Sequence, residues 1–307
     1  MEAVRVNKRN KAILLIILSA FSFAFMFAFV RLSGELPTMQ KVFFRNFVAL
    51  FFALGVMKKQ KIPFRCKSRK NSAVLFMRAF AGSLGMIANF YAIDVLVLSD
   101  ASILNKMSPF FCVVFSFLFL KEKLSLFNIL TIIGAFVGAL FVIKPSFANA
   151  DLFASMMGFF GGMSAGLAYT CVRYLGQHGE KGPMIVAAFS AFSCILTLPW
   201  LIFDFHPMSW WQVLCLIGAG FGAAGGQFAI TAAYSNAPAK EISIFDYTQI
   251  IFTAALGFLM FSDVPDLWSL LGYVIIISMA LIVFIRNNKK TNSPEAEAPE
   301  AEVTNSK

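Results

Sequence analysis

Long apolar runs, each close to the length that crosses a lipid bilayer, recur along the whole sequence. A helix that spans the hydrocarbon core needs about 20 predominantly apolar residues, and short polar breaks separate ten runs of this kind. Inside hydrocarbon every backbone N–H and C=O needs a partner within the protein, and apolar runs without two-residue alternation achieve this only as helices. We therefore predict ten transmembrane helices, over Ala12–Arg31, Met39–Met57, Ser72–Ile93, Ser99–Leu120, Leu126–Ile143, Leu152–Leu175, Pro183–Phe203, Trp210–Tyr234, Lys240–Phe261 and Leu267–Ile285.

The composition excludes a water-soluble fold. Hydrophobic residues make up 59% of the chain and charged residues only 14%, whereas soluble domains carry about 25% charged residues. The first apolar run is longer than the core of a secretory signal peptide, so we expect it to be retained as a helix. The five cysteines show no paired spacing for a disulfide or a zinc site. We expect no metal and no cofactor.

The distribution of basic residues predicts the orientation of the chain. Cytoplasmic loops of membrane proteins are enriched in Lys and Arg, and most of the 26 basic residues fall on one side if the N-terminus is cytoplasmic, above all those in residues 58–70. We predict a multi-pass protein of the inner (plasma) membrane with both termini cytoplasmic. Anionic lipid head groups account for the net charge of +10, so a nucleic-acid partner is not needed.

An internal repeat predicts the domain organisation. Residues 85–143 align without a gap with residues 226–284, and acidic residues stay in register, Asp100 with Glu241 and Glu122 with Asp263. An odd number of helices in each half turns the second copy upside down, which is the arrangement of many transporters. We predict an all-α membrane protein of two inverted five-helix repeats, residues 12–143 and 152–285. A cytoplasmic tail, residues 1–11, precedes them, and a disordered acidic tail, residues 286–307, follows.

Ionisable side chains within the apolar runs are the first candidates for a binding site, because burying a charge in hydrocarbon is costly. Arg45, Arg78, Lys106 and Asp246 fall within the predicted helices. For Arg45 the alternatives are reaching the interface or pairing with an acid such as Asp94 or Asp100, and for Arg78 the favoured alternative is reaching the cytoplasmic interface.

Polar residues around Lys106 recur at the equivalent depth of the second half. Asn105 and Lys106 align with Asp246 and Tyr247, and Pro109 is expected to bend the fourth helix because it frees a backbone carbonyl. In the eighth helix Gln227 and Tyr234 lie on one face. These residues could bind a polar substrate, and helix–helix hydrogen bonds are the alternative for Gln227 and Tyr234. Glycines repeated every four residues, such as Gly158, Gly162 and Gly166, indicate close helix packing.

The sequence around Ser164 matches the G-x-S-x-G pattern of some serine hydrolases. It lies inside an apolar helix, however, and the two histidines fall in loops on opposite sides of the membrane. We therefore expect no catalytic residues.

The order and spacing of these motifs resemble those of the drug/metabolite transporter superfamily, in its EamA-like branch of ten helices. The resemblance rests on Arg45 in Phe44-Arg45-Asn46-Phe47, on Pro109 followed by Leu120-Lys121-Glu122, and on the glycine-rich fifth helix. The second half departs from the pattern, with Ile250 in place of a proline and Asp263 in place of a glutamate.

The resemblance implies carriage of amino acids, other metabolites or drugs, often outward. We hypothesise a gradient-driven transporter of small polar metabolites that works by alternating access without ATP hydrolysis. If Arg45 and Lys106 line the cavity, they favour an anionic substrate such as an amino acid or organic acid. A non-transporting membrane scaffold or receptor and, third, an intramembrane enzyme are the alternatives. A homodimer is left open.

Overall fold

A computed structural model describes residues 2–120, 126–143, 151–236 and 243–291. These residues form helices and no strand. The helices, in chain order, are α1 (Glu2–Leu32), α2 (Thr38–Lys59), α3 (Arg69–Val95), α4 (Leu98–Asn105), α5 (Ser108–Leu120), α6 (Leu126–Ile143), α7 (Leu152–Gln177), α8 (Gly182–Phe203), α9 (Trp210–Asn236), the short 3-10 helix η1 (Ser243–Tyr247), α11 (Thr248–Phe261) and α12 (Leu267–Thr291).

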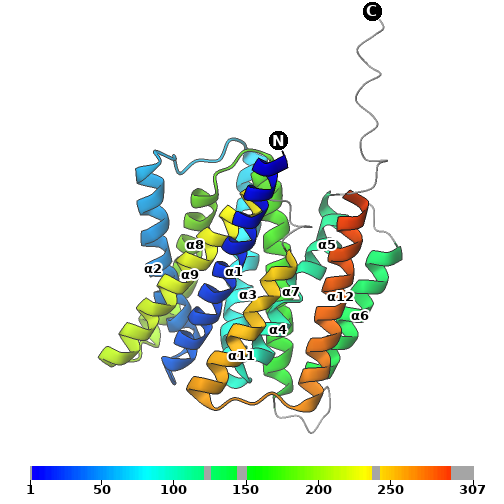
Figure 1. Cartoon of the computed structure of the whole chain (residues 1–307). Coiled ribbons are helices and arrows are strands. Elements are labelled where there is room, and N and C mark those ends of the chain that lie inside the picture. Colours follow the sequence, from blue (N-terminus) through cyan, green and yellow to red (C-terminus); the bar gives the residue numbers. More distant parts are fainter. Residues whose placement is uncertain (1, 121–125, 144–150, 237–242, 292–307) are drawn as a thin grey trace, which may run out of the picture.

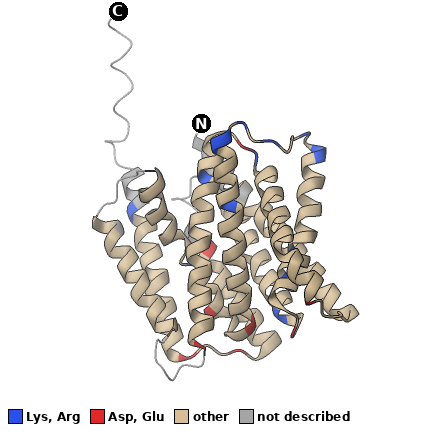
Figure 2. Cartoon of the chain, turned by 180° about the vertical axis from the view of Figure 1, so that it is seen from behind, with Lys and Arg blue, Asp and Glu red and all other residues tan. Residues whose placement is uncertain are grey.

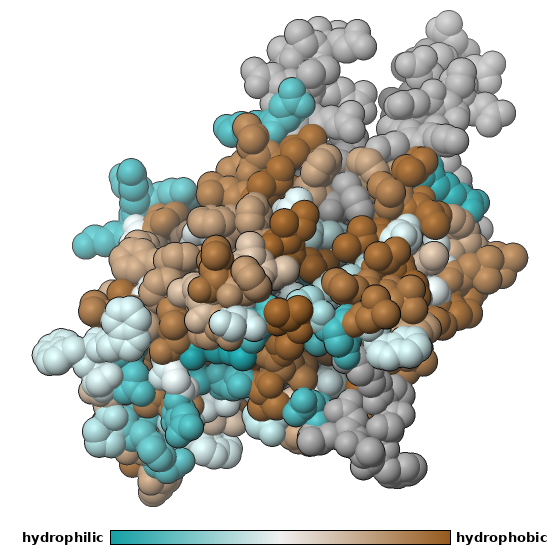
Figure 3. Space-filling model, turned by 60° about the horizontal axis from the view of Figure 1, so that its bottom comes forward, coloured by the Kyte–Doolittle hydropathy of each residue, from teal (hydrophilic) through white to brown (hydrophobic). Residues whose placement is uncertain are grey.

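The predicted all-helical membrane fold is confirmed. Eight segments of the described chain are long and apolar enough to cross a membrane, and two shorter apolar helices, Ile129–Ile143 and Phe245–Phe261, accompany them. Large apolar side chains face outward over much of the surface (Figure 3), including Phe203 and Trp210. Such a surface is stable against lipid and not against water. The number of ten crossings stays a prediction.

The contacts between helices are symmetric. Each pair recurs when both helices are replaced by their counterparts in the other half. The α1 helix packs on α9 as α7 packs on α3, and α1 packs on α11 as α7 packs on α5. Two further pairs, α2 with α8 and α6 with α12, join equivalent helices of the two halves. The first helix of each half also runs in the opposite direction to its counterpart, as α1 and α7 in Figure 1 show. The two inverted repeats thus form one interlocked bundle.

The predicted fourth crossing segment is interrupted in the turn before Pro109. We predicted one helix over Ser99–Leu120 with a bend at Pro109, and the structure has two helices in its place, since α4 ends at Asn105 and α5 begins at Ser108. Pro109 therefore lies in the first turn of α5, where its missing N–H would have no helical partner anyway. The break falls at Lys106 and Met107.

The ninth crossing segment has a matching discontinuity. The 3-10 helix η1 changes to the α-helix α11 between Tyr247 and Thr248, and the internal repeat aligns these residues with Lys106 and Met107. The predicted start of this segment at Lys240 lies outside the described residues. The two halves thus depart from α-helical geometry at equivalent positions, by a break between α4 and α5 and by a change from 3-10 to α-helix between η1 and α11.

The glycine-rich faces are points of close helix contact, as predicted. A Cβ atom at Gly162 would lie 2.4 Å from the carbonyl oxygen of Leu104 and 3.1 Å from that of Asn105. A Cβ atom at Gly85 would lie 2.8 Å from the Cβ atom of Ser164, so the G-x-S-x-G serine is a packing residue between α3 and α7. The absence of a side chain at Gly162 lets α7 approach the carbonyls at the broken end of α4.

Charged groups separate between the two ends of the bundle. We call the end at which α1 begins and α12 ends the terminal end, and the other the distal end (Figure 1). Lys and Arg gather mainly at the terminal end (Figure 2). At the distal end Arg31 pairs with Asp263, which also accepts a hydrogen bond from the Leu98 N–H (3.0 Å), and Lys41 pairs with Asp94 (2.6 Å). These contacts hold α1, α4 and the start of the α11–α12 connection together.

We expect Gly162→Ala to lower the thermal unfolding midpoint of the detergent-purified protein, because the new methyl group would collide with backbone carbonyls that cannot rotate away. Overpacking of this kind costs about 1–3 kcal/mol. Gly55→Ala in α2 is the matched control, since nothing lies within 4 Å of its new methyl group, and alanine's higher helix propensity should leave the midpoint unchanged or raised. Equal midpoints for the two variants would contradict this assignment.

Candidate functional site

A cavity of about 100 Å³ lies where the two halves meet. Helices of both halves line it. The first half contributes residues of α1, α2, α3 and α4, and the second half contributes residues of α7, α8, α9 and α11. Its walls carry aromatic and apolar side chains together with eight longer polar ones, Arg45, Arg78, Asn89, Asn105, Lys106, Tyr169, Gln227 and Gln249. Apolar walls with a few convergent polar groups are typical of small-molecule sites.

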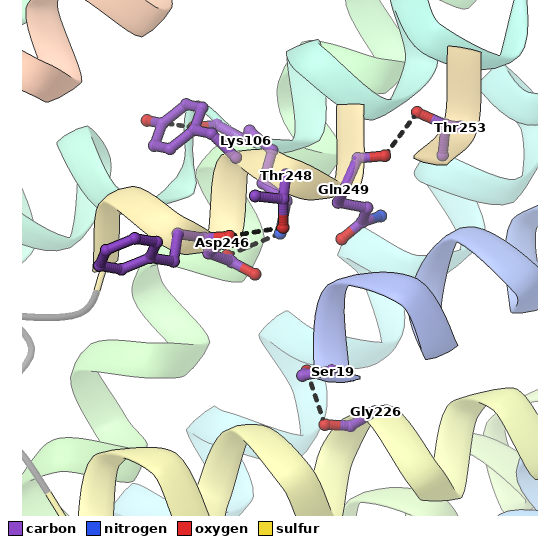
Figure 4. A network of polar contacts seen from close by, with 9 residues as sticks. Ser19, Lys106, Gly226, Asp246, Thr248, Gln249 and Thr253 are labelled. Carbon is purple, nitrogen blue, oxygen red and sulfur yellow. Dashed lines mark hydrogen bonds and ion pairs between the residues drawn. The ribbon is translucent and has the colours of Figure 1, made fainter. Parts of the chain in front are cut away.

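The two interrupted segments contact each other beside this cavity. The Lys106 Nζ atom donates to Asp246 Oδ2 at 2.6 Å, a pair visible in Figure 4. The Tyr247 hydroxyl donates to the carbonyl oxygen of Lys106 at 3.1 Å. A carbonyl at a helix break inside the bilayer needs such a partner. The break in the first half is therefore satisfied by residues at the equivalent break of the second half.

The Lys106–Asp246 pair is almost completely buried, with 6% and 10% of the two side chains exposed. Among the residues that the structure describes, Asp246 Oδ1 has no hydrogen-bond partner, so the carboxylate keeps one acceptor. Thr248 and Thr253 bond back to carbonyls of their own segment (Figure 4), which satisfies their hydroxyl groups locally. The lysine charge is neutralised within the protein.

Arg45 projects from α2 into the cavity. Its side chain donates to Asn46 Oδ1 at 2.7 Å and contacts the sulfur of Met86 at 3.4 Å. Its Nε atom has no hydrogen-bond partner in the described part of the chain. The alternative that Arg45 pairs with Asp94 is wrong, because Lys41 takes that carboxylate. The guanidinium keeps unsatisfied N–H donors at the cavity wall.

Arg78 also lies in the cavity, so its interpretation as a residue that reaches the membrane interface is wrong. It is 3% exposed, and its guanidinium carbon lies 4.3 Å from the centre of the Phe189 ring. Its Nε atom has no hydrogen-bond partner. Arg45 approaches the same ring at 6.0 Å. Two guanidinium groups thus share one aromatic side chain.

The other predicted site residues divide into three groups. Asn105 and Gln227 line the cavity with Arg45 and Lys106. Asp246 and Tyr247 contact Lys106 and are absent from the cavity lining. The side chain of Tyr234 lies outside the described part of the chain. A role of any of them in binding substrate stays a prediction.

Sequence reasoning missed Asn89, Tyr169 and Phe189 and did not single out Gln249. One signal was available: Arg78, Gly82, Gly85 and Asn89 are spaced by four, three and four residues, which places two polar groups and two small residues on one face of α3. Tyr169 and Phe189 carry no such signal, because an aromatic residue in an apolar helix is usually a packing or lipid-facing residue. Within the described residues no cluster of His, Cys, Asp and Glu could hold a metal ion.

Known proteins resemble this chain along most of its length. Pseudopaline exporter CntI of Pseudomonas aeruginosa is 31% identical over 283 residues, which cover 91% of this chain and 98% of the exporter. An uncharacterised transporter of Helicobacter pylori is 29% identical over 88% of this chain and 93% of its own. Solute carrier family 35 member G1 of Mus musculus is 26% identical over a region that covers 85% of this chain and 74% of the solute carrier.

The fold is also known from a solved structure. A protein of known crystal structure superposes on this chain with a TM-score of 0.64, and the match covers 93% of this chain and 100% of the other. The sequence identity is 14%, so the likeness is one of fold alone. The sequence matches the EamA-like transporter family twice, over residues 10–144 and 152–285. With both matches and a relative above 30% identity along nearly the full length, the chain belongs to the EamA-like transporter family of multi-pass membrane transporters.

Proposed function

We propose that this protein exports small polar metabolites by alternating access, driven by a gradient and not by ATP hydrolysis. The observation that carries the proposal is the polar cavity between two inverted halves, at the place where α4 ends and where η1 passes into α11. Inverted repeats around a central site are the arrangement that can expose one site to either side in turn. The name of the Pseudomonas relative, an exporter, supports the outward direction.

The contacts at the distal end support a state closed on that side. Arg31, Asp263 and the Leu98 N–H join α1, the α11–α12 connection and the start of α4. To release substrate there, the protein must break these bonds and form others. Because each is a short polar contact at the end of a helix, a rocking motion of one half against the other can exchange them without unfolding a helix.

We further propose that the protein lies in the inner (plasma) membrane with both termini in the cytoplasm, with residues 12–143 and 152–285 as its two repeats. The excess of Lys and Arg at the terminal end supports this orientation (Figure 2). The driving force must then come from an ion or substrate gradient, because the sequence carries no Walker-type loop.

Comparison of extracellular metabolites tests transport directly. Cells that express the protein should release at least one metabolite about ten-fold faster than cells without it, and Ala165→Phe should abolish the difference because it fills the cavity. Ala255→Phe, an exposed position in α11, is the matched control and should keep the release. Equal metabolite profiles with and without surface-expressed protein would favour a scaffold or receptor, and a chemically converted product would favour an enzyme.

The Lys106–Asp246 pair should show strong coupling. Asp246→Asn leaves a buried lysine without a counter-charge, a change that typically costs about 3–5 kcal/mol, so we expect a large fall in the thermal unfolding midpoint. Lys106→Met combined with Asp246→Asn should regain most of it, because no unpaired charge remains. Additive effects of the two substitutions would show that the pair does not stabilise the junction of the two broken segments.

The orientation can be tested with a native cysteine. Cys66 lies partly exposed in the α2–α3 loop, whereas Cys112, also partly exposed, lies within the apolar helix α5, and Cys171, Cys194 and Cys215 are buried within helices. A membrane-impermeant maleimide should label the protein in inside-out vesicles and not in right-side-out vesicles, and Cys66→Ser should remove the label. Labelling only in right-side-out vesicles would reverse the proposed orientation.

A further inference from the structure

We infer that the cavity binds an organic dianion and that Arg45 and Arg78 hold its anionic oxygens, which belong either to two carboxylates or to one phosphate. The inference rests on the proposed transport function and names its substrate class. Sequence reasoning assigned anion binding to Arg45 and Lys106. The geometry points to Arg45 and Arg78 instead, for three reasons: charge balance, free hydrogen-bond donors and the space left for Arg78.

Charge balance separates Lys106 from the two arginines. Lys106 is neutralised by Asp246 at 2.6 Å. Neither Arg45 nor Arg78 forms an ion pair within the described part of the chain, where Lys41 and Arg31 pair with Asp94 and Asp263. The cavity wall therefore carries two uncompensated positive charges, and a ligand with two negative charges would neutralise both.

Both guanidinium groups keep N–H donors that nothing in the described structure satisfies. The Nε atoms of Arg45 and Arg78 are buried and unpartnered. The contacts with Phe189, 6.0 and 4.3 Å from its ring centre, engage the ring face, which leaves the planar edges of a guanidinium free for hydrogen bonds. An unpaired buried donor costs free energy, and a bidentate carboxylate or phosphate removes this cost.

Gly82 makes room for the guanidinium of Arg78. A Cβ atom at Gly82 would lie 2.2 Å from an Nη atom of Arg78 and 3.0 Å from the Phe189 ring. A methyl group there must therefore displace the end of the arginine side chain, which is flexible enough to move without unfolding the helix. Gly82 is thus a positioning residue for Arg78, and it offers a way to move the charge without removing it.

Thermal unfolding of the purified full-length protein in detergent tests the inference without knowledge of the natural substrate. The probes are succinate, malate and glycerol 3-phosphate, compared at equal ionic strength with alanine and putrescine. At least one dianionic probe should raise the unfolding midpoint by roughly 5 °C at saturation, and alanine and putrescine should leave it unchanged. A response to succinate or malate alone identifies carboxylate as the bound group, and a response to glycerol 3-phosphate alone identifies phosphate.

Variants then assign the response to the arginines. Arg45→Gln and Arg78→Gln should each abolish the dianion response, and without ligand each should unfold at or above the wild-type midpoint, because an uncompensated buried charge has been removed. Gly82→Ala should raise the half-saturating concentration at least five-fold while all charges remain. Arg286→Gln is the matched control, since Arg286 lies 4.0 Å over the Phe127 ring outside the cavity lining, and it should keep the full response.

The inference is overturned if no dianion stabilises the wild-type protein, if alanine or putrescine stabilises it as much, or if both arginine variants retain the response. Its failure is distinguishable from failure of the proposed function. If cells release neutral or cationic metabolites and no dianion binds, this inference is wrong and the proposed transport function is retained. If a dianion binds and no metabolite is released, the proposed transport function is wrong and the binding site is retained.

Discussion

A membrane-spanning segment that stops being helical inside the bilayer must find partners for the backbone groups it frees, and this constraint governs the centre of the protein. In the first half the freed group is the Lys106 carbonyl, which accepts a hydrogen bond from the Tyr247 hydroxyl. The Lys106 side chain pairs with Asp246. Both partners come from the equivalent discontinuity of the second half. The backbone carbonyl freed at the break of the first half is thus satisfied by the second half.

Close packing of backbones makes this junction possible. Gly162 brings α7 against the last carbonyls of α4, and Gly85 brings α3 against α7. Side chains larger than hydrogen at these places would push the helices apart and separate Lys106 from its partners. Beside the junction lies the cavity, and polar groups from both halves face it.

The electrostatics of the cavity follow from which charges the fold neutralises. Lys106 has an internal counter-ion, whereas Arg45 and Arg78 share the face of Phe189 and keep unsatisfied donors. An internal ion pair stabilises the resting protein, and uncompensated guanidinium groups are stabilised by a ligand. The same cavity is therefore lined by one lysine that is neutralised from outside the cavity and by two arginines that are not neutralised by any residue the structure describes.

The sequence by itself determined the helical membrane fold, the repeat and its inversion. Hydrophobic length and internal similarity are properties of the chain, and an odd number of helices in each half fixes the relative direction of the halves. It also placed Arg45, Asn105, Lys106 and Gln227 in a shared central region, because an ionisable or polar group inside an apolar run is costly unless it faces protein or water.

Only the tertiary structure decided which of these charges is neutralised and where the fourth segment breaks. The pairing of Lys106 with Asp246, and not with another acid, depends on how the two halves pack, which no local pattern contains. Arg78 reads in sequence as a residue near the membrane interface, yet Gly82 and Phe189 direct its side chain into the cavity. The hydroxyl group that satisfies the freed Lys106 carbonyl belongs to Tyr247, in the other half of the chain, and no local pattern reveals this partner.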